Sequence, residues 1–259
     1  KEKYFMAHIL CGGVDAATER INSKTDADNI SGACLNGQAL VTSVVKEEKA
    51  VAPPKLYDLT TLQREANRLH GYTAQQVLDT LQSLYEKKLC TYPRTDSNYL
   101  TEDMEESTRS LIRQCSHLYS FSAATAYEPN IRRCINNAKV SDHHAILPTV
   151  EIVHLDFNSL TEKEAVILAQ ITMRLFCATA DSEIYEQTKV KAVCCDNEFF
   201  ASGKQIKQAG WSKIEKQYKS TLLLALALTA CQQDHISPEA TVYSDQMSFN
   251  ILSPGAQTK

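Results

Sequence analysis

Short apolar runs at two places near the start of the chain predict β-strands. The runs are YFMAHIL at residues 4–10 and GQALVTSVV at residues 37–45, and a charged run follows the second. The intervening segment, SKTDADNISGACLNG, is rich in turn-forming residues, and the Pro53-Pro54 pair stops any regular element. We therefore expect residues 1–58 to form a β-containing segment.

Helical spacing dominates the next hundred residues. The candidate capping boxes, in which side chains satisfy free donors at a helix start, are Thr60 with Gln63, Thr73 with Gln76, and Thr161 with Glu164. Thr101, followed by two acidic residues, predicts another helix start. The first helix should end near His70, with Gly71 in the left-handed conformation, so that the first two helices form a helix-turn-helix. The helix after Thr161 is apolar enough to be buried on most sides.

Strand patterning returns after residue 182. TKVKAVCC and EFFASG, joined by a turn at Asp196-Asn197, predict a hairpin. Further on, STLLLALALTAC is apolar but too short to span a bilayer, so it predicts a buried helix or strand and no membrane association. Its last residues, ending at Cys231, would pass for a lipoprotein signal only at an N-terminus. We assign no role to the tail from about residue 221.

The net charge and the cysteines limit the kinds of ligand and the cellular compartment that we expect. A net charge of −4 gives no overall attraction to phosphate, so contact with nucleic acid must come from local placement of charge. The segment from Lys189 to Lys219 contains seven lysines and three acidic residues, which indicates either a solvated face or a DNA-facing surface. Nine cysteines without a C-x-x-C pair favour a reducing cytoplasm and no metal site. The start without methionine leads us to expect an internal fragment of a longer protein.

The segment Thr91-Tyr92-Pro93-Arg94 carries the clearest chemistry. A tyrosine oxygen can attack phosphorus when the developing charge is stabilised, and a guanidinium two residues away can bind two phosphate oxygens. A turn with a packed tyrosine and a surface arginine is the alternative on composition alone.

Two longer blocks resemble one enzyme family. The stretch from Lys55 to Met104, which includes YPRTDS, resembles the tyrosine-bearing region of type IA DNA topoisomerases, in the topoisomerase III branch. Ser141–Thr149, with the sequence SDHHAILPT, resembles the family's H-x-A-I-x-P-T motif at about the expected distance downstream. The two motifs occur in the right order.

The resemblance implies a role for each matching residue. Tyr92 corresponds to the nucleophile, which in that family forms a 5′-phosphotyrosine ester with one DNA strand. Arg94 corresponds to the arginine that binds the scissile phosphate, and His143 to the histidine that hydrogen-bonds backbone phosphate near the cut. Asp96 matches an aspartate that orients neighbours. For His143 a core or capping histidine is the alternative, and for Asp96 a cap on the next turn.

The resemblance also implies what this stretch does not contain. In the family, acidic residues of an N-terminal Toprim domain hold Mg²⁺, and no such domain is found here. Asp26-Ala27-Asp28 has the D-x-D spacing, but ERINSK precedes it in place of a buried strand, so we interpret it as a turn or helix start. A segment that lines the DNA path in relatives is also missing. We therefore expect the isolated chain to be inactive without the Toprim domain.

The fold that the resemblance implies is mixed α+β. A helical catalytic-tyrosine domain, with a helix-turn-helix like that of catabolite activator proteins, is inserted into a strand-rich arch or gate domain. We expect residues 1–58 to form the first part of the gate, 59–182 the tyrosine domain and 183–259 the return part of the gate.

The resulting hypothesis is a DNA topoisomerase, an isomerase that relaxes or decatenates DNA by passing a strand through a transient single-strand break. Its partners would be single-stranded DNA and the missing domains of the same protein, in the cytoplasm at the nucleoid, with Mg²⁺ and no nucleotide cofactor. Two alternatives remain: a sequence-specific helix-turn-helix module and a non-catalytic interaction protein. Against the first, the second helix carries only Lys87 and Lys88 as basic residues, at the end away from base-reading positions.

Overall fold

The structure is a computed structural model that describes residues 3–11, 13–122 and 128–230. It has the predicted mixed α+β character, and it divides into two compact units. The strand-rich unit contains the described residues within 1–49 and 185–207. The helical unit contains those within 50–184 and 208–235.

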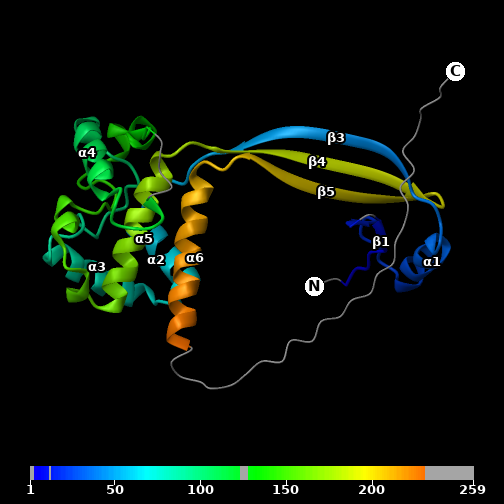
Figure 1. Cartoon of the computed structure of the whole chain (residues 1–259), viewed down its shortest axis with the longest axis horizontal. Helices are drawn as coiled ribbons and strands as arrows, with labels where there is room; N and C mark the ends of the chain where they lie inside the picture. Colours follow the sequence, from blue (N-terminus) through cyan, green and yellow to red (C-terminus); the bar gives the residue numbers. More distant parts are fainter. Residues whose placement is uncertain (1–2, 12, 123–127, 231–259) are drawn as a thin grey trace. The chain divides into compact units, whose positions relative to one another are not determined.

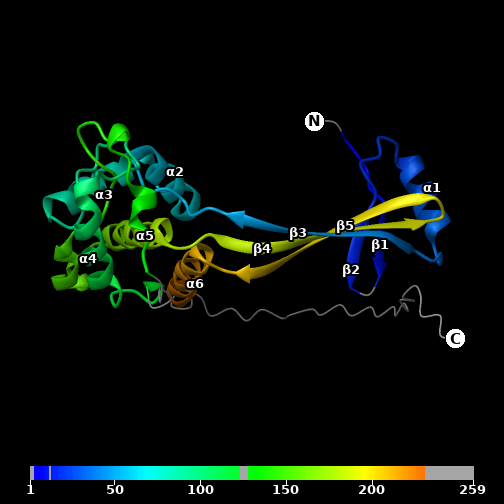
Figure 2. The same ribbon diagram turned by 90° about the horizontal axis from the view of Figure 1, so that it is seen from above.

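One five-stranded sheet has the order β1-β2-β5-β4-β3. The strands are β1 His8–Cys11, β2 Val14–Ala17, β3 Leu40–Val51, β4 Glu183–Cys194 and β5 Asn197–Gln208. Strands β1 and β2 pair antiparallel, and β2 meets β5 where Ala17 lies opposite Phe200. Strands β3, β4 and β5 run side by side in both views (Figures 1 and 2).

Strands β1, β3, β4 and β5 overlap the four runs predicted as strands, with different limits, whereas β2 was not predicted. Strand β3 continues through the charged run Lys46–Lys49 to Val51, because nearly all of its side chains are exposed and charges there need no burial. The turn of the β4–β5 hairpin lies at Cys195-Asp196, one residue earlier than predicted. Cys195 and Asp196 both have positive φ, as in a two-residue hairpin turn, and β5 therefore begins at Asn197.

The segment predicted as turn-rich contains a helix, so that prediction is wrong. Helix α1, Lys24–Cys34, begins after Ser23, whose side chain accepts a hydrogen bond from the backbone N of Asp26 at 3.3 Å. Of the two interpretations of the D-x-D spacing, a turn or a helix start, the second is therefore the one that the structure shows for Asp26. Cys34, at the end of α1, is buried in a small apolar cluster with Ala7, Ala16, Cys194 and Phe199. This burial fixes the helix where local preferences favour turns.

The helical unit is built around one buried helix. Its helices are α2 Leu59–His70, α3 Ala74–Glu86, α4 Glu105–Cys115, α5 Glu162–Thr179 and α6 Trp211–Ala230, and short 3₁₀ segments lie at Glu102–Met104, Ile131–Cys134, Asn137–Lys139, Val150–His154 and Phe157–Ser159. Helix α5 packs against α3, α4 and α6, and most of its side chains are buried, as predicted (Figure 1). Helix α6 belongs to this unit, although its sequence was assigned to the second strand-rich segment.

Side-chain caps define most of the helix starts. The capping boxes at Thr73 and Thr161 are confirmed, and Gly71 ends α2 with a φ of 71°. The box predicted at Thr60 is wrong, because Asp58 caps α2 instead and accepts from the backbone N of Thr61 at 2.7 Å. Thr101 precedes the 3₁₀ segment that leads into α4, without a side-chain cap.

The apolar run near the end of the chain is helical. It forms the second half of α6 up to Ala230, and Cys231 and the rest of the tail to residue 259 lie outside the described residues. Among the helices that the structure describes, none combines the length and the apolar character that crossing a membrane requires.

Candidate functional site

The segment of residues 91–97, here called the tyrosine loop, follows α3 and alternates between buried and exposed side chains. Pro93, Thr95 and Ser97 are buried, and Arg94 and Asp96 are exposed. Tyr92, on the same side of the alternation as Arg94, is half-buried. In extended backbone, successive side chains point to opposite sides. The loop therefore presents its candidate catalytic residues on one side and its anchoring residues on the other.

The anchors of the tyrosine loop bind a second segment, residues 141–149, here called the histidine loop. The backbone N of Thr91 donates to the carbonyl of Leu147 at 2.9 Å, and the Thr91 hydroxyl accepts from the backbone N of Leu147 at 3.0 Å. The same hydroxyl donates to the carbonyl of Ala145 at 3.3 Å. These bonds join residues that lie more than fifty positions apart in the chain.

A second anchor holds the histidine itself. The Thr95 hydroxyl donates to the carbonyl of His143 at 3.0 Å and accepts from the backbone N of Ser97 at 3.1 Å. Because Thr95 is buried, water cannot replace these bonds without local opening. The backbone of His143 is thus fixed relative to the residue that follows Arg94.

The result is that two of the three predicted site residues are in contact. The rings of Tyr92 and His143 have centroids 4.2 Å apart and planes inclined by 37°. The ring of Tyr85, in the last turn of α3, forms a T-shaped contact with the ring of Tyr92, with centroids 5.6 Å apart. Arg94 is exposed and forms no hydrogen bond or ion pair within the described part of the chain. Its guanidinium is therefore available to a ligand, as is the exposed His143 side chain.

Three buried tyrosines of the helical unit are poorly suited to act as nucleophiles. Burial raises the pKa of Tyr57, Tyr119 and Tyr218 above the ordinary value of a phenol. These three hydroxyls lie within the core and out of reach of a polymer substrate. Tyr92 is only half-buried. Its ring contacts Tyr85 and His143, and the rest of its side chain remains accessible to a ligand.

A buried network of hydrogen bonds connects the histidine loop to the core of the helical unit. Tyr57 pairs with Ile146 in an antiparallel bridge, and its hydroxyl accepts hydrogen bonds from Arg174 at 2.9 Å and Gln170 at 3.2 Å, both on α5. Arg174 also forms a close ion pair with Glu65 on α2. The loop is therefore tied to two helices of the core.

A basic cleft of about 400 Å³ lies in the same unit. Its charged lining residues are one acid and four cations, namely Glu65, Lys55, Arg64, Arg68 and Arg174. The cleft also reaches Asn98, directly after the tyrosine loop. Sequence reasoning missed this cleft, although the i, i+4 spacing of Arg64 and Arg68 places both on one face of a helix.

Positive charge also surrounds Tyr99, two residues beyond the tyrosine loop. The ammonium nitrogens of Lys55 and Lys139 lie 5.0 and 5.3 Å from the centre of its ring. A hydrogen bond from Lys55, together with the charge of both lysines, lowers the pKa of Tyr99. This arrangement favours an anionic ligand.

The described residues do not fit a magnesium ion. Asp26 and Asp28 lie in α1, outside any cluster of metal-binding side chains found among those residues. The group that could hold a metal ion consists of Cys34, Cys194 and Cys195, and thiolates are poor ligands for Mg²⁺, which prefers oxygen. Sequence reasoning missed this thiol group because 160 residues separate Cys34 from Cys194.

The lysine-rich segment does not form a single surface of one unit. Lys189 to Lys207 belong to the strand-rich unit, while Lys213 to Lys219 lie in α6 of the helical unit. Some of these lysines are paired, such as Lys191 with Glu198 at 2.7 Å.

Comparison with known proteins agrees with the two sequence blocks. A family model described as DNA topoisomerase matches residues 2–241. The chain is 37% identical to DNA topoisomerase 3 of Bacillus subtilis (strain 168) over 182 residues, which cover 68% of this chain and 25% of that protein. It is 36% identical to DNA topoisomerase 3 of Bacillus licheniformis over 190 residues, which cover 71% of this chain and 26% of that protein. The chain thus spans about a quarter of the length of the curated relatives it matches.

A solved structure shares the fold. The full-length topoisomerase I from Thermotoga maritima aligns with a TM-score of 0.62 at 22% identity, over 83% of this chain and 36% of that chain. The family model covers all but the ends of the sequence, and relatives in the topoisomerase III branch match about 70% of it. The chain therefore belongs to the type IA DNA topoisomerase family.

Proposed function

We propose that this chain supplies the strand-cleaving tyrosine of a type IA topoisomerase. In the proposed reaction the Tyr92 oxygen attacks a phosphodiester of single-stranded DNA. The bond from phosphorus to the 3′ oxygen breaks, the phenol proton is lost, and the 3′ oxygen leaves as a hydroxyl. The DNA 5′ phosphate is then joined to Tyr92. Attack by the 3′ hydroxyl reverses each change and reseals the strand, so no nucleotide cofactor is consumed.

The contact between the Tyr92 and His143 rings carries this proposal. Both residues belong to separately recognised motifs, and the threonine anchors bring them to a ring distance of 4.2 Å. In the proposed complex His143 donates a hydrogen bond to a phosphate oxygen beside the cut. Arg94, exposed on the same side of the tyrosine loop, binds the scissile phosphate and stabilises its developing charge.

The basic cleft supports single-stranded DNA as the ligand. Lys55, Arg64 and Arg68 offer charge for backbone phosphates, and their contribution should weaken as salt rises. In this proposal the DNA strand runs from the cleft past Asn98 to Tyr92. The exposed rings of His143 and Tyr85 provide surfaces on which bases can stack.

The domain roles form part of the same proposal. The chain leaves the strand-rich unit, forms most of the helical unit and returns, which suits a tyrosine domain inserted into a gate domain. We assign residues 1–58 and the strands that follow residue 182 to the gate, and residues 59–182 together with α6 to the tyrosine domain. The described residues do not provide oxygen ligands clustered for Mg²⁺, so the isolated chain is proposed to need a Toprim domain for cleavage.

Complementation in trans tests the proposal. The 259-residue chain would be mixed with a separately expressed Toprim fragment of the Bacillus subtilis relative, magnesium and a single-stranded oligonucleotide. A label at the 3′ end should become attached to the chain, and a label at the 5′ end should not. Tyr92→Phe should abolish the adduct. Tyr85→Phe is the matched control, because it removes the hydroxyl of a neighbouring tyrosine but keeps the ring for base stacking, and it should leave the adduct unchanged.

Two outcomes would contradict the proposal. An adduct that persists in Tyr92→Phe would place the nucleophile elsewhere. Failure of the mixture to form any adduct, while the full-length relative forms one in parallel, would favour the non-catalytic alternative. A discrete footprint on duplex DNA would instead favour the sequence-specific helix-turn-helix module.

A further inference from the structure

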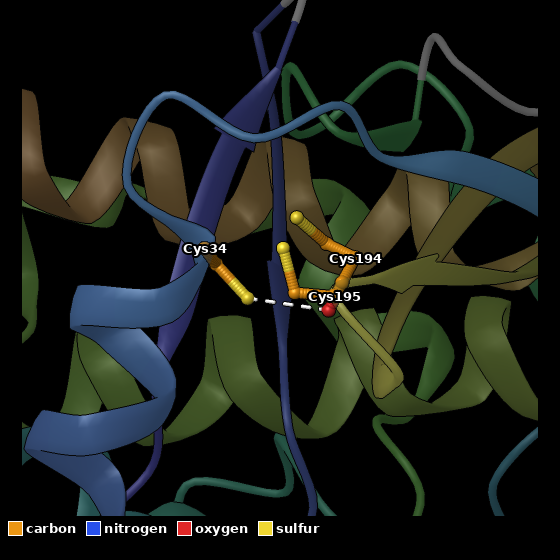
Figure 3. A group of neighbouring side chains, drawn as sticks. All are labelled: Cys34, Cys194 and Cys195. Atoms are coloured by element: carbon orange, nitrogen blue, oxygen red, sulfur yellow. Dashed lines mark hydrogen bonds between the residues drawn. The ribbon is translucent and has the colours of Figure 1, made fainter.

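Three cysteines from distant parts of the sequence converge in the strand-rich unit. Cys34 ends α1, Cys194 ends β4, and Cys195 opens the hairpin turn (Figure 3). Their sulfur atoms all lie within 4.8 Å of one another. Cys34 and Cys194 are buried, and Cys195 is exposed. These three residues are here called the cysteine cluster.

The backbone at Cys195 adopts a conformation that cysteine does not favour. Cys195 has a φ of 46° and Asp196 a φ of 61°, the left-handed region preferred by glycine and asparagine in tight hairpin turns. A cysteine at the first turn position therefore carries a conformational cost. Strained residues of this kind concentrate at functional sites. The strain places the Cys195 sulfur beside the two buried thiols.

The turn after α1 makes room for the sulfurs. A Cβ added to Gly37 would lie 3.0 Å from the Cys194 sulfur and 3.4 Å from the Cys195 sulfur. The backbone N of Gly37 donates to the carbonyl of Cys34 at 3.0 Å, which holds the turn close to the end of the helix. Glycine here lets the backbone approach the cluster where any side chain would crowd it.

The thiols of Cys34 and Cys195 are held by weak bonds that a metal ion could replace. The Cys34 thiol donates to the carbonyl of Cys194 at 3.3 Å, and the Cys195 thiol donates to the carbonyl of Ala33 at 3.2 Å. Loss of the thiol protons would free three sulfurs that already face a common space (Figure 3). Binding would release those protons to solvent.

We propose that the cysteine cluster is a binding site for one thiophilic metal ion, with zinc as the ion and water as its fourth ligand. Zinc–sulfur bonds of about 2.3 Å in a tetrahedral site place sulfurs roughly 3.8 Å apart, so the cluster needs to contract by about an ångström at most. Sulfur ligands select zinc and other soft ions over Mg²⁺. The exposed Cys195 gives the ion a path from solvent and space for the water.

The site would strengthen a weak part of the molecule. Two of the five buried residues in the apolar cluster of the strand-rich unit are Cys34 and Cys194. A metal ion would therefore bind the end of α1 to the tip of the β4–β5 hairpin. This proposal is independent of Tyr92 and of DNA cleavage.

Metal titration of the full chain tests the site. The chain, stripped with a chelator and kept reduced, should bind one zinc ion per molecule, and Cd²⁺ should produce thiolate charge-transfer absorption. At a hundredfold excess over the dissociation constant, zinc should slow hydrogen exchange in the β4–β5 hairpin by about a hundredfold, if that unit opens as a whole. Cys34→Ser should reduce both the zinc content and the cadmium absorption to background.

Two further variants separate metal binding from folding. Cys195→Asn should remove zinc binding and also raise the melting temperature of the metal-free chain by about 2 °C, because asparagine tolerates the left-handed turn. Cys134→Ser is the matched control. It removes a buried thiol of the helical unit, and serine can still donate to the carbonyl of Ala178. This control should retain one zinc ion.

Two outcomes would overturn the proposal. The first is equal zinc binding by the wild-type chain, Cys34→Ser and Cys195→Asn. The second is a reduced wild-type chain that binds no zinc but forms a disulfide between two of the clustered cysteines on exposure to air.

Discussion

The helical unit and the strand-rich unit hold their side chains in different ways. In the helical unit, residues from α2, α3, α4 and α5 and from the histidine loop share one buried cluster that includes Leu62, Leu84 and Ile146, and Cys90, directly before the tyrosine loop, belongs to it. In the strand-rich unit, β3 exposes nearly every side chain, Val44 and Val45 among them, and the apolar cluster has five buried residues. The tyrosine loop is therefore positioned by a packed core, while the long strands depend mainly on backbone pairing.

The largest expected effect contrasts a core leucine with a strand valine. Leu62→Ala removes a fully buried side chain and should lower the free energy of unfolding of the helical unit by about 4 kcal/mol. Val44→Ala, at an exposed position of β3, should change stability by less than about 1 kcal/mol. Trp211, the only tryptophan, lies in α6 and reports the helical unit by fluorescence during urea unfolding. Hydrogen exchange reports the strands. Equal losses for the two variants would break the comparison.

Next in size is the buried network beneath the histidine loop. Arg174→Met leaves Glu65 and the Tyr57 hydroxyl without their shared partner and should cost about 3 kcal/mol in urea unfolding followed by Trp211 fluorescence. The double variant Glu65→Leu/Arg174→Met should recover most of that loss, because no buried charge is then left unpaired and Arg68, the other partner of Glu65, is exposed. If the single variant matched wild type, the network would not support the loop.

A smaller change acts at the anchor of His143. Thr95→Val removes the hydroxyl that donates to the His143 carbonyl and accepts from the backbone N of Ser97, at a cost of about 2 kcal/mol. Adduct formation in the complementation assay should also fall, because the two motif loops are no longer joined at this point. Thr95→Ser keeps the hydroxyl and should behave like wild type. Normal adduct yield from a folded Thr95→Val would show that this anchor is not needed.

The smallest effect is a pH dependence in α5. Burial alone would raise the pKa of Glu164, but hydrogen bonds from Lys87, Ser83 and Thr161 outweigh it and lower the pKa from 4.5 to about 2. A folded-state pKa below the unfolded value means that the ionised carboxylate stabilises the fold above about pH 5 and that this contribution is lost toward pH 2. The free energy of unfolding of the wild-type chain should exceed that of Glu164→Gln by about 1 kcal/mol at neutral pH, and this difference should disappear on acidification. A constant difference from pH 7 to pH 2 would contradict the assignment.

Local signals made the helical unit predictable. Thr73 and Thr161 cap helices because the residues that complete each box lie three positions away, and Gly71 ends α2 through its own backbone freedom. Thr60 has the spacing of a cap but does not act as one, because Asp58, two residues earlier, accepts the hydrogen bond from the backbone N of Thr61. Caps depend on neighbours in sequence, so errors there are small.

Features that depend on distant partners could not be predicted. Helix α1 forms because Cys34 is buried against residues of β2, β4 and β5, and nothing within the segment indicates that burial. The cysteine cluster depends on the same packing. The motifs singled out Tyr92 and His143, but not the ring contact between them, which the hydroxyls of Thr91 and Thr95 maintain across some fifty residues.

The alternation of the tyrosine loop has a consequence for how its length can change. If one residue were inserted between Thr91 and Thr95, every side chain after the insertion would point to the opposite side of the loop. The hydroxyl anchors and the reactive groups could then no longer both point in their present directions. Inserting two residues would preserve the facing and alter only the reach. Natural or engineered variants of this loop should therefore tolerate even changes in length far better than odd ones.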